Sequence, residues 1–510
     1  MPYINIPARI YIFIKLSYKL LKGKKMEIIT RDVLHPEFEI TALNRDKDDN
    51  IYYIHMSREQ LSKKIDLAKT YLIKEFNAKK GQKVMMCITY WPNYPIWLFA
   101  CSELGMKFVV TDFPKTKLAM EKMPDFLTCD IVCWDMIYPP GFDQPKFEHK
   151  KLNCNVLDTY NPDEIISPIW CESTDIIMVT TSSGTTATPK IIEHTHEFFY
   201  QLMNVNSKMF KLEEDEKCWH DKNLQHGVIL GAYFLPLANK CKSHFHAPVG
   251  WDGGEREDLL HKAMVEKVQS EKINRIAIFF DAMEWFSEEL DITRKLHDDM
   301  KVHYIGTMKE KYLNKVAGEF GYTIIPNFGS QEVGGPVFYC EIDKSNYKTW
   351  NVKSYGTPSP FYKEVSVIED NILKITDYKG NDIFTGDKFE INDGIFTYLG
   401  RADLCRINGK TVYAYFLNPV LEDITGLKKE NDFDLVFDSD AESWYLRTNT
   451  ELDLVELNKK LETHTDPSYY SISKQIVGPR KQFFIDGWKF SNAMVRLAIT
   501  DGIEVLEKKI

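Results

Sequence analysis

The most informative chemistry in the sequence is a short loop rich in hydroxyl groups. It runs from Thr181 to Lys190 as TSSGTTATPK and lies between the apolar run DIIMVT and the pair Ile191-Ile192. Hydroxyl groups and backbone N–H groups of such a loop can surround phosphate oxygens, and a terminal lysine adds a positive charge. The spacing GxxxxGK[ST] of a Walker A loop is absent. The loop therefore predicts phosphate binding of another kind, with an ordinary solvated Ser/Thr turn as the alternative.

Three segments further along the chain carry residue types that suit a nucleotide. The first, Phe328-Gly329-Ser330-Gln331-Glu332, combines an aromatic ring with a carboxylate just after an expected strand. The others are Thr385-Gly386-Asp387 and Gly400-Arg401-Ala402-Asp403. Each is ordinary alone, since a Gly-Asp pair usually marks a turn. Their order behind the hydroxyl loop makes them informative.

These segments resemble the adenylate-forming superfamily, which includes acyl- and aryl-CoA synthetases, peptide-synthetase adenylation domains and beetle luciferases. Ser-Gly-Thr-Thr-x-x-Pro-Lys resembles the signature loop of that family, and the three later segments match family motifs in the family's order. The resemblance covers about residues 50–410. It includes His226-Gly227, in the region where the family has a histidine before a glycine-containing helix that lines the acyl pocket.

The resemblance implies a role for each motif. The ring of Phe328 would stack on adenine, Glu332 would hold Mg²⁺, and Asp387 would accept hydrogen bonds from the ribose hydroxyls. Arg401 would reach ribose or phosphate, and Asp403 would be the hinge of a small mobile domain. The full set of implied nucleotide-binding residues is Thr181, Ser182, Ser183, Gly184, Thr185, Thr186, Lys190, Phe328, Gly329, Gln331, Asp387 and Arg401. The implied catalytic residues are Lys489, Glu332 and His226.

The catalytic lysine is the least determined of these residues. The family places it before the end of the small domain, and the best match is Lys489 in Asp486-Gly487-Trp488-Lys489-Phe490. A surface lysine on a hairpin is the alternative for that position. Lys474 and Lys481 are competing candidates.

The implied activity is activation of a carboxylic acid by ATP. The acid is joined to AMP with release of pyrophosphate, and the acyl group then passes to a thiol, either CoA or the pantetheine of an acyl carrier protein. Some positions depart from the family pattern: Ala187 replaces a usual glycine, Gln331 a threonine and Arg406 a lysine. Two alternatives therefore stay open, a non-catalytic nucleotide-binding or scaffold protein of the same fold, and acyl transfer to an amine or hydroxyl.

The acid itself is not readable from the residues. The aromatic residues near the expected pocket hint at an aromatic or apolar acid, but such residues fill cores more often than they line pockets. The residues in question are Trp219, Tyr233, Phe234 and Phe338.

The elements that must position these motifs follow an alternating rhythm of strand and helix. Ser57 and Gln60 form a capping-box pattern that starts a helix to about Phe76. Further helices are expected over 96–104, 257–270 and 309–319. Strands are expected over 83–90, 107–111, 175–180, 275–280, 302–305 and 323–326.

This rhythm predicts an α/β fold with doubly wound sheets. Beyond Tyr362 short alternating strands with turns at Asn371, Lys379-Gly380 and Asp393-Gly394 indicate an antiparallel β subdomain near 350–400. We expect a large AMP-binding domain over 1–401 and a small mobile α+β domain over 402–510.

The amino-acid composition indicates which cellular compartment and which binding partners to expect. Of 510 residues 44% are hydrophobic, and 64 basic against 74 acidic side chains give a net charge of −10. This charge offers no bulk attraction to nucleic acid. The ten cysteines are scattered, which predicts a reduced, cytoplasmic protein in which Cys129 and Cys133 are buried thiols. Residues 4–21 are apolar but interrupted by charges, so we expect no transmembrane span there, with contact to a membrane surface as the alternative.

Overall fold

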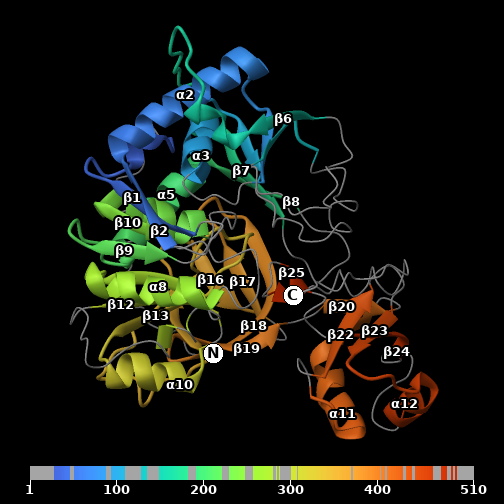
Figure 1. The fold of residues 1–510 in the computed structure, drawn as a ribbon. Coiled ribbons are helices and arrows are strands. Elements are labelled where there is room, and N and C mark those ends of the chain that lie inside the picture. The colour runs from blue at the N-terminus through green and yellow to red at the C-terminus, as the bar shows by residue number, and fades with distance from the viewer. Residues whose placement is uncertain are drawn as a thin grey trace.

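The computed structural model describes most of the chain between residues 28 and 490. The described residues are 28–45, 51–87, 93–109, 128–134, 149–181, 191–220, 229–246, 257–279, 283, 286–287, 300–306, 308–368, 371–401, 404–407, 410–428, 432–438, 443–462, 472–478, 484–485 and 489–490. They form two α/β sheets, an antiparallel sheet beside them, and a smaller C-terminal part, shown in Figure 1.

The first α/β sheet has the strand order β6-β5-β3-β4-β7-β8. Its strands are β3 (Lys83–Cys87), β4 (Lys107–Val109), β5 (Ile131–Trp134), β6 (Lys150–Asn153), β7 (Ile176–Thr181) and β8 (Ile191–Thr195). All its pairs are parallel except β7 with β8. Helices α2 (Arg58–Phe76) and α3 (Asn93–Glu103) pack against each other beside it (Figure 1).

The second α/β sheet has the order β13-β12-β11-β9-β10-β1-β2. Its strands are β1 (Glu39–Arg45), β2 (Ile51–Ser57), β9 (Lys217–His220), β10 (Ser243–His246), β11 (Arg275–Phe279), β12 (Lys301–Ile305) and β13 (Thr323–Asn327). All its pairs are parallel except the edge hairpin of β1 and β2. The two mostly parallel sheets confirm the predicted doubly wound α/β class.

The helices connected with these sheets include α5 (His196–Met209), η4 (Leu230–Phe234), α7 (Leu235–Lys240), α8 (Glu257–Ser270), α10 (Glu310–Tyr312) and η5 (Leu313–Glu319). Those over 257–270 and 309–319 were predicted from the sequence pattern, whereas α5, η4 and α7 were not. The capping box of α2 is formed, with Ser57 accepting from Gln60 N and the Gln60 side chain accepting from Ser57 N. The helix expected over 309–319 exists, but its second half, η5, is a π-helix rather than an α-helix.

The antiparallel sheet confirms the predicted β subdomain and extends it toward the N-terminus. It has the order β14-β15-β19-β18-β17-β16. Its strands are β14 (Phe338–Tyr339), β15 (Ser354–Pro358), β16 (Glu364–Val367), β17 (Ile372–Thr376), β18 (Asp382–Asn392) and β19 (Ile395–Arg401). The three expected turns are formed: Asn371, Gly380, Asp393 and Gly394 all have positive φ.

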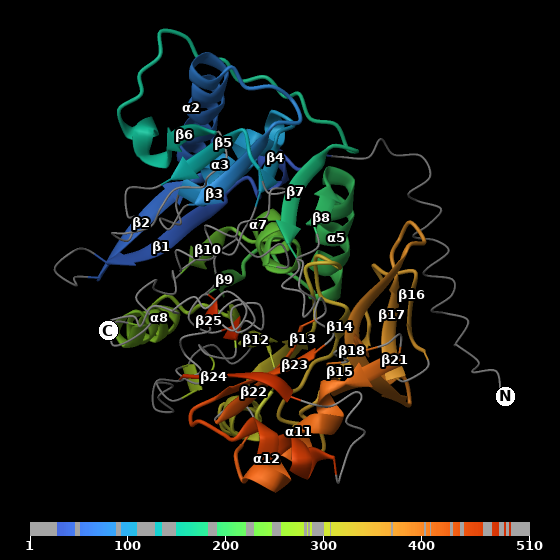
Figure 2. The same cartoon turned by 90° about the vertical axis from the view of Figure 1, so that its right-hand side faces the viewer.

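The C-terminal part has a small core of its own. Its elements are β20 (Leu404–Ile407), β21 (Lys410–Tyr413), α11 (Ala414–Thr425), β22 (Phe433–Asp438), β23 (Ser443–Thr448), α12 (Leu454–Leu461), β24 (Ile472–Val477), β25 (Phe484–Ile485) and β26 (Lys489–Phe490). The three-stranded sheet β22-β23-β24 and both helices surround Leu421, Trp444, Leu446 and Leu461. Figure 2 shows α11, α12 and β22 of this part near the bottom of the view.

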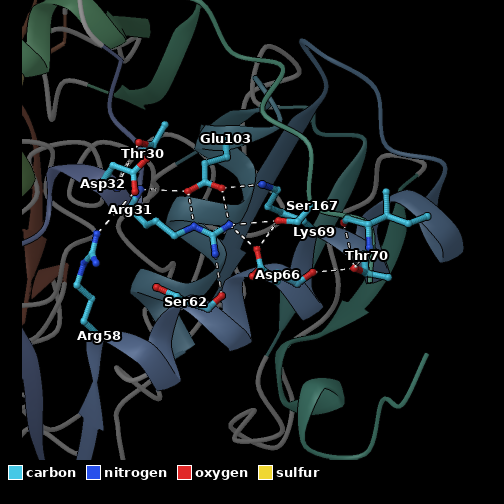
Figure 3. Close-up of polar contacts among 11 residues, drawn as sticks. Thr30, Arg31, Asp32, Arg58, Ser62, Asp66, Lys69, Thr70, Glu103 and Ser167 are labelled. Atoms are coloured by element: carbon cyan, nitrogen blue, oxygen red, sulfur yellow. Dashed lines mark hydrogen bonds and ion pairs between the residues drawn. The ribbon is translucent and has the colours of Figure 1, made fainter. Parts of the chain in front are cut away.

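A buried ion network holds the chain before β1 against α2 and α3 (Figure 3). Glu103 on α3 accepts hydrogen bonds from Arg31 Nε at 2.8 Å and from Lys69 Nζ at 2.7 Å. Arg31 also pairs with Asp66 at 2.6 Å. The side chains of Lys69 and Glu103 are fully buried. Because each buried charge has a partner, contacts within the network replace the water that each charge loses on burial.

The described helices include none with the length and apolar character needed to cross a membrane. Residues 4–21, for which the sequence leaves membrane-surface contact open, lie outside the described residues.

Candidate nucleotide site

The hydroxyl loop leaves and rejoins the first sheet at one point. Strands β7 and β8 are antiparallel neighbours, and Thr181 pairs directly with Ile191. Thr181 is therefore the last residue of β7, and residues 182–190 join two chain ends that lie side by side. The predicted loop residues Ser182, Ser183, Gly184, Thr185, Thr186 and Lys190 themselves lie outside the described residues.

The segment after β13 forms a closed turn. Gly329 and Pro336 bridge in antiparallel fashion, and Val337 N donates to Phe328 O at 2.7 Å. Within the turn, Gly334 N donates to Ser330 O at 3.0 Å. Gly334 has φ +63°, and a Cβ there would lie 2.6 Å from the Phe198 ring, so a larger residue would be strained and crowded. This turn, residues 329–336, carries the predicted residues Gln331 and Glu332.

A histidine connects this turn to the strand that ends the hydroxyl loop. The Nε2 atom of His194 on β8 lies 2.9 Å from the carbonyl oxygen of Gln331. Its ring stacks on Phe198 at 4.5 Å between ring centres. Burial lowers the pKa of His194 to about 4, although the Gln331 carbonyl and the charge of Glu332 oppose the shift. The ring is therefore neutral at neutral pH.

Phe328 lies among aromatic rings contributed by the β subdomain. Its ring is 4.9 Å from that of Phe389, 5.6 Å from that of Tyr355 and 6.0 Å from that of Tyr398. Phe328 stays partly exposed, whereas Phe389 is fully buried. The cluster fixes the ring while leaving part of it accessible, as stacking on a base requires.

Asp387 lies beside this cluster. Its carboxylate accepts a hydrogen bond from the Tyr398 hydroxyl at 3.4 Å, and the residue is only 8% exposed. Its neighbour Gly386 has φ +76°, a conformation that favours glycine. Asp387 on β18 is the register partner of Arg401 on β19, so the backbone brings these two predicted residues together.

The turn that carries Glu332 offers oxygen ligands of the kind that bind Mg²⁺ together with the phosphates of a nucleotide. Ser330 Oγ and Gln331 Oε1 are buried and have no hydrogen-bond partner within the described part of the chain. Oxygen atoms of this kind, together with a carboxylate, are the ligands that Mg²⁺ prefers. Among the described residues no group of three or more His, Cys, Asp and Glu forms a metal cage. Glu332 therefore fits a Mg²⁺ that is held largely by the phosphates of a nucleotide.

The remaining predicted residues are placed only in part. His226 and Asp403 lie outside the described residues. Lys489 pairs with Ile485 in the hairpin β25-β26, which places its backbone but not its side chain. Lys474 is exposed on β24, with its ammonium 5.5 Å from the centre of the Tyr445 ring, and Lys481 lies outside the described residues.

The four aromatic residues that hinted at the acid are all core residues. They are Trp219, Tyr233, Phe234 and Phe338, each at most 1% exposed. Sequence reasoning missed three residues that contact the site, namely His194, Tyr355 and Tyr398. A histidine within a short apolar strand was the available signal for His194.

The fold and this site define a class of protein: a two-part α/β protein in which the turn after β13 of one sheet contacts strand β8 of the other. Residues 38–378, more than half of the chain, match the family model described as AMP-binding enzyme. The chain belongs to the AMP-binding enzyme family. A comparison with curated protein sequences gave no match.

Solved structures with the same fold cover nearly the whole chain. One is o-succinylbenzoate coenzyme A synthetase (MenE) from Bacillus subtilis in complex with AMP, with 13% identity, a TM-score of 0.66, and coverage of 91% of this chain and 96% of that one. Another is McyG A-PCP complexed with phenylalanyl-adenylate, with 16% identity, a TM-score of 0.64, and coverage of 94% and 97%. A third is a fatty acyl CoA synthetase from Mycobacterium tuberculosis, with 13% identity, a TM-score of 0.63, and coverage of 87% and 93%. At these identities the likeness concerns the fold.

Proposed function

We propose that this protein activates a carboxylic acid with ATP, forming an acyl-adenylate and releasing pyrophosphate, and then passes the acyl group to a thiol. The observation that carries the proposal is the arrangement around Phe328. Tyr398 lies beside the Phe328 ring and donates a hydrogen bond to the Asp387 carboxylate, and His194 on β8 contacts the turn that carries Glu332. Family membership and the ligands of the solved structures, among them ATP with magnesium and acyl-adenylates, support it.

The first step needs positioning more than covalent help from the protein. A carboxylate oxygen attacks the α-phosphorus of ATP, and pyrophosphate leaves with the electron pair of the broken P–O bond. The Phe328 ring would hold adenine, Asp387 would orient the ribose, and the loop 181–190 would enclose the phosphates. Mg²⁺ at Glu332 would neutralise phosphate charge. Lys489 would contribute positive charge where the carboxylate and the α-phosphate meet.

In the second step a thiolate attacks the carbonyl carbon of the acyl-adenylate, and AMP leaves. The thiol would belong to CoA or to the pantetheine of a carrier protein. The C-terminal part, proposed as residues 402–510 with Asp403 as the hinge, would rotate between the two steps.

The test of the first step is isotope exchange between pyrophosphate and ATP with pure protein and a panel of aryl, short-chain and long-chain acids. We expect exchange that depends on one class of acid and on Mg²⁺. Glu332→Gln should lower it about 100-fold, because an isosteric amide removes the charge that binds the metal. Glu319→Gln, the same change at an exposed site on η5, is the matched control and should exchange like the wild type.

Two results would decide against the proposal. Binding of ATP without exchange for any acid would favour a non-catalytic nucleotide-binding protein. An amide or ester product formed in the absence of a thiol would move the second step to another acceptor.

A further inference from the structure

His194 occupies the junction between two segments of the nucleotide site. It lies on β8, four residues after position 190, where the loop ends, and pairs with Met178 on β7. Its side chain contacts the turn 329–336 through the Gln331 carbonyl at 2.9 Å. One side chain therefore joins the strand that ends the hydroxyl loop to the residue that precedes Glu332.

The contact has a fixed direction. A carbonyl oxygen only accepts hydrogen bonds, so Nε2 must carry the proton and donate. Because the ring is neutral, its single N–H is committed to the Gln331 carbonyl. His194 is only 4% exposed, so water has little access to replace the bond.

The ring itself is held from both sides. Phe198 stacks on it with an angle of 24° between the ring planes, and Phe199 lies 5.2 Å away at 59°. On the turn side, a Cβ built on Gly334 would lie 3.2 Å from His194 Cε1, which shows how closely the turn packs on the ring. The Tyr362 hydroxyl fixes the other side of the turn by donating to Val333 O at 3.1 Å.

We propose that His194 is a positioning residue that holds the Gln331–Glu332 backbone against strand β8, so that the Glu332 carboxylate has a fixed place from which to bind a metal–nucleotide complex. The proposal rests on the proposed function for the role of Glu332. Without the hydrogen bond, the turn would still fold on its own bonds, but the carboxylate would lose its fixed place relative to β8.

The experiment compares three substitutions that differ in where they place a donor. In His194→Gln the amide nitrogen can occupy the place of Nε2 and keep the bond. In His194→Asn the shorter side chain carries its nitrogen near the place of Nδ1, out of reach of the carbonyl. His194→Leu has no donor but keeps apolar bulk against Phe198.

We measure the Mg²⁺ concentration for half-maximal exchange, the KM for ATP and, by calorimetry, the Mg²⁺ dependence of ATP binding. His194→Leu and His194→Asn should raise the Mg²⁺ requirement roughly tenfold, the usual scale for residues that orient a metal ligand. His194→Gln should stay within about threefold of the wild type. Thermal unfolding of each variant shows whether it is folded, and if the leucine variant is not, the comparison of Asn with Gln decides.

His196→Asn is the matched control. His196 lies two residues further on, is fully buried, and accepts a hydrogen bond from Ile29 N at 3.1 Å instead of contacting the turn. This variant should lose stability without a change in its Mg²⁺ requirement. Folded Asn and Leu variants at position 194 with wild-type Mg²⁺ dependence would overturn the proposal, as would an equal change in the control.

Failure of the proposed function gives a different pattern. A wild-type chain that binds ATP with Mg²⁺ but shows no exchange would refute acid activation, and the calorimetric comparison would still test His194. A wild-type chain that binds no ATP at any Mg²⁺ concentration would overturn both.

Discussion

At the scale of single residues, the site depends on side chains whose places are fixed by neighbours from other segments. Asp387 illustrates this: its position on β18 is set by Gly386 and by the Arg401 register, and its carboxylate by Tyr398. The motif Thr-Gly-Asp made this residue predictable. Tyr398 was not predictable, because an aromatic residue in a strand looks the same whether it fills a core or touches a carboxylate.

We predict that Asp387→Ala raises the KM for ATP at least tenfold and changes kcat much less. The reason is that hydrogen bonds from hydroxyl groups to a charged acceptor contribute about 1.5–3 kcal/mol each. Steady-state exchange kinetics at varied ATP check this. Asp382→Ala, on the same strand but paired with Lys374 at 2.9 Å, is the control and should bind ATP normally. Equal KM values for the two variants would contradict the ribose role.

His196 gives a prediction for pH. Burial lowers its pKa from 6.5 to about 4, with the charge of Asp175 opposing the shift. Between these values the unfolded chain binds a proton that the folded chain does not, so the free energy of unfolding falls as the pH drops from about 6.5 to 4. The His196→Asn variant lacks this group. The stability gap between wild type and variant should therefore shrink by about 2 kcal/mol from pH 7.5 to pH 5.

Urea unfolding at the two pH values measures the gap. A gap that does not change with pH would show that the histidine at position 196 is not held neutral in the folded protein.

At the scale of elements, local sequence patterns were sufficient and long-range contacts were not. The capping box of Ser57 and Gln60 predicted the start of α2, because both of its hydrogen bonds are made within four residues. The π-helical half of the helix over 309–319 was missed, because its hydrophobic spacing does not distinguish it from an α-helix. The bond of His194 to Gln331 spans 137 positions, and no local pattern reports such a contact.

At the scale of elements, we predict the effect on stability of breaking the network of Arg31, Lys69 and Glu103 (Figure 3). Burial alone raises the pKa of Glu103, but hydrogen bonds from Arg31 and Lys69 outweigh it and hold the pKa below its ordinary value. Glu103→Gln would leave Lys69 buried without a counter-charge and would leave Arg31 paired with Asp66 alone. We expect it to lower the free energy of unfolding by about 3–5 kcal/mol, the usual cost of breaking a buried ion pair.

The same substitution at an exposed pair is the control. Glu59 binds Lys63 at 2.6 Å on α2, and both side chains are more than 70% exposed. Glu59→Gln should cost far less than Glu103→Gln, because water and salt screen an exposed ion pair. Similar losses at both sites in urea unfolding would mean that the network contributes no more than a surface pair.

At the scale of the whole molecule, the sequence predicted the classes of sheet and their order, because strand and helix alternate visibly until about Tyr362 and strands alone follow as far as about residue 400. The way the sheets come together was available only through the family resemblance. The arrangement of Phe328 with Tyr355, Phe389 and Tyr398 joins segments that are far apart in the sequence, and hydrophobic patterning does not specify which buried faces meet.

The C-terminal part, which carries the candidate catalytic lysines, has a separate core. That core draws its described residues from positions 420–472, apart from the two larger cores. A part with its own core can move as a unit, so a lysine on it can approach the site for one step only. Of the three candidate lysines that the sequence offers, Lys489 and Lys474 lie within the described residues.

We predict that Lys489→Ala lowers acid-dependent pyrophosphate–ATP exchange at least 100-fold, while calorimetry shows an ATP affinity within about threefold of the wild type. Positive charge at the reacting carboxylate stabilises mainly the transition state. The substitution should therefore lower kcat rather than the affinity for ATP. Lys474→Ala, the matched control, should exchange normally because its ammonium lies over Tyr445 on its own sheet. If instead Lys474→Ala loses exchange and Lys489→Ala does not, the catalytic role belongs to β24, and the part that moves must turn a different face toward Glu332.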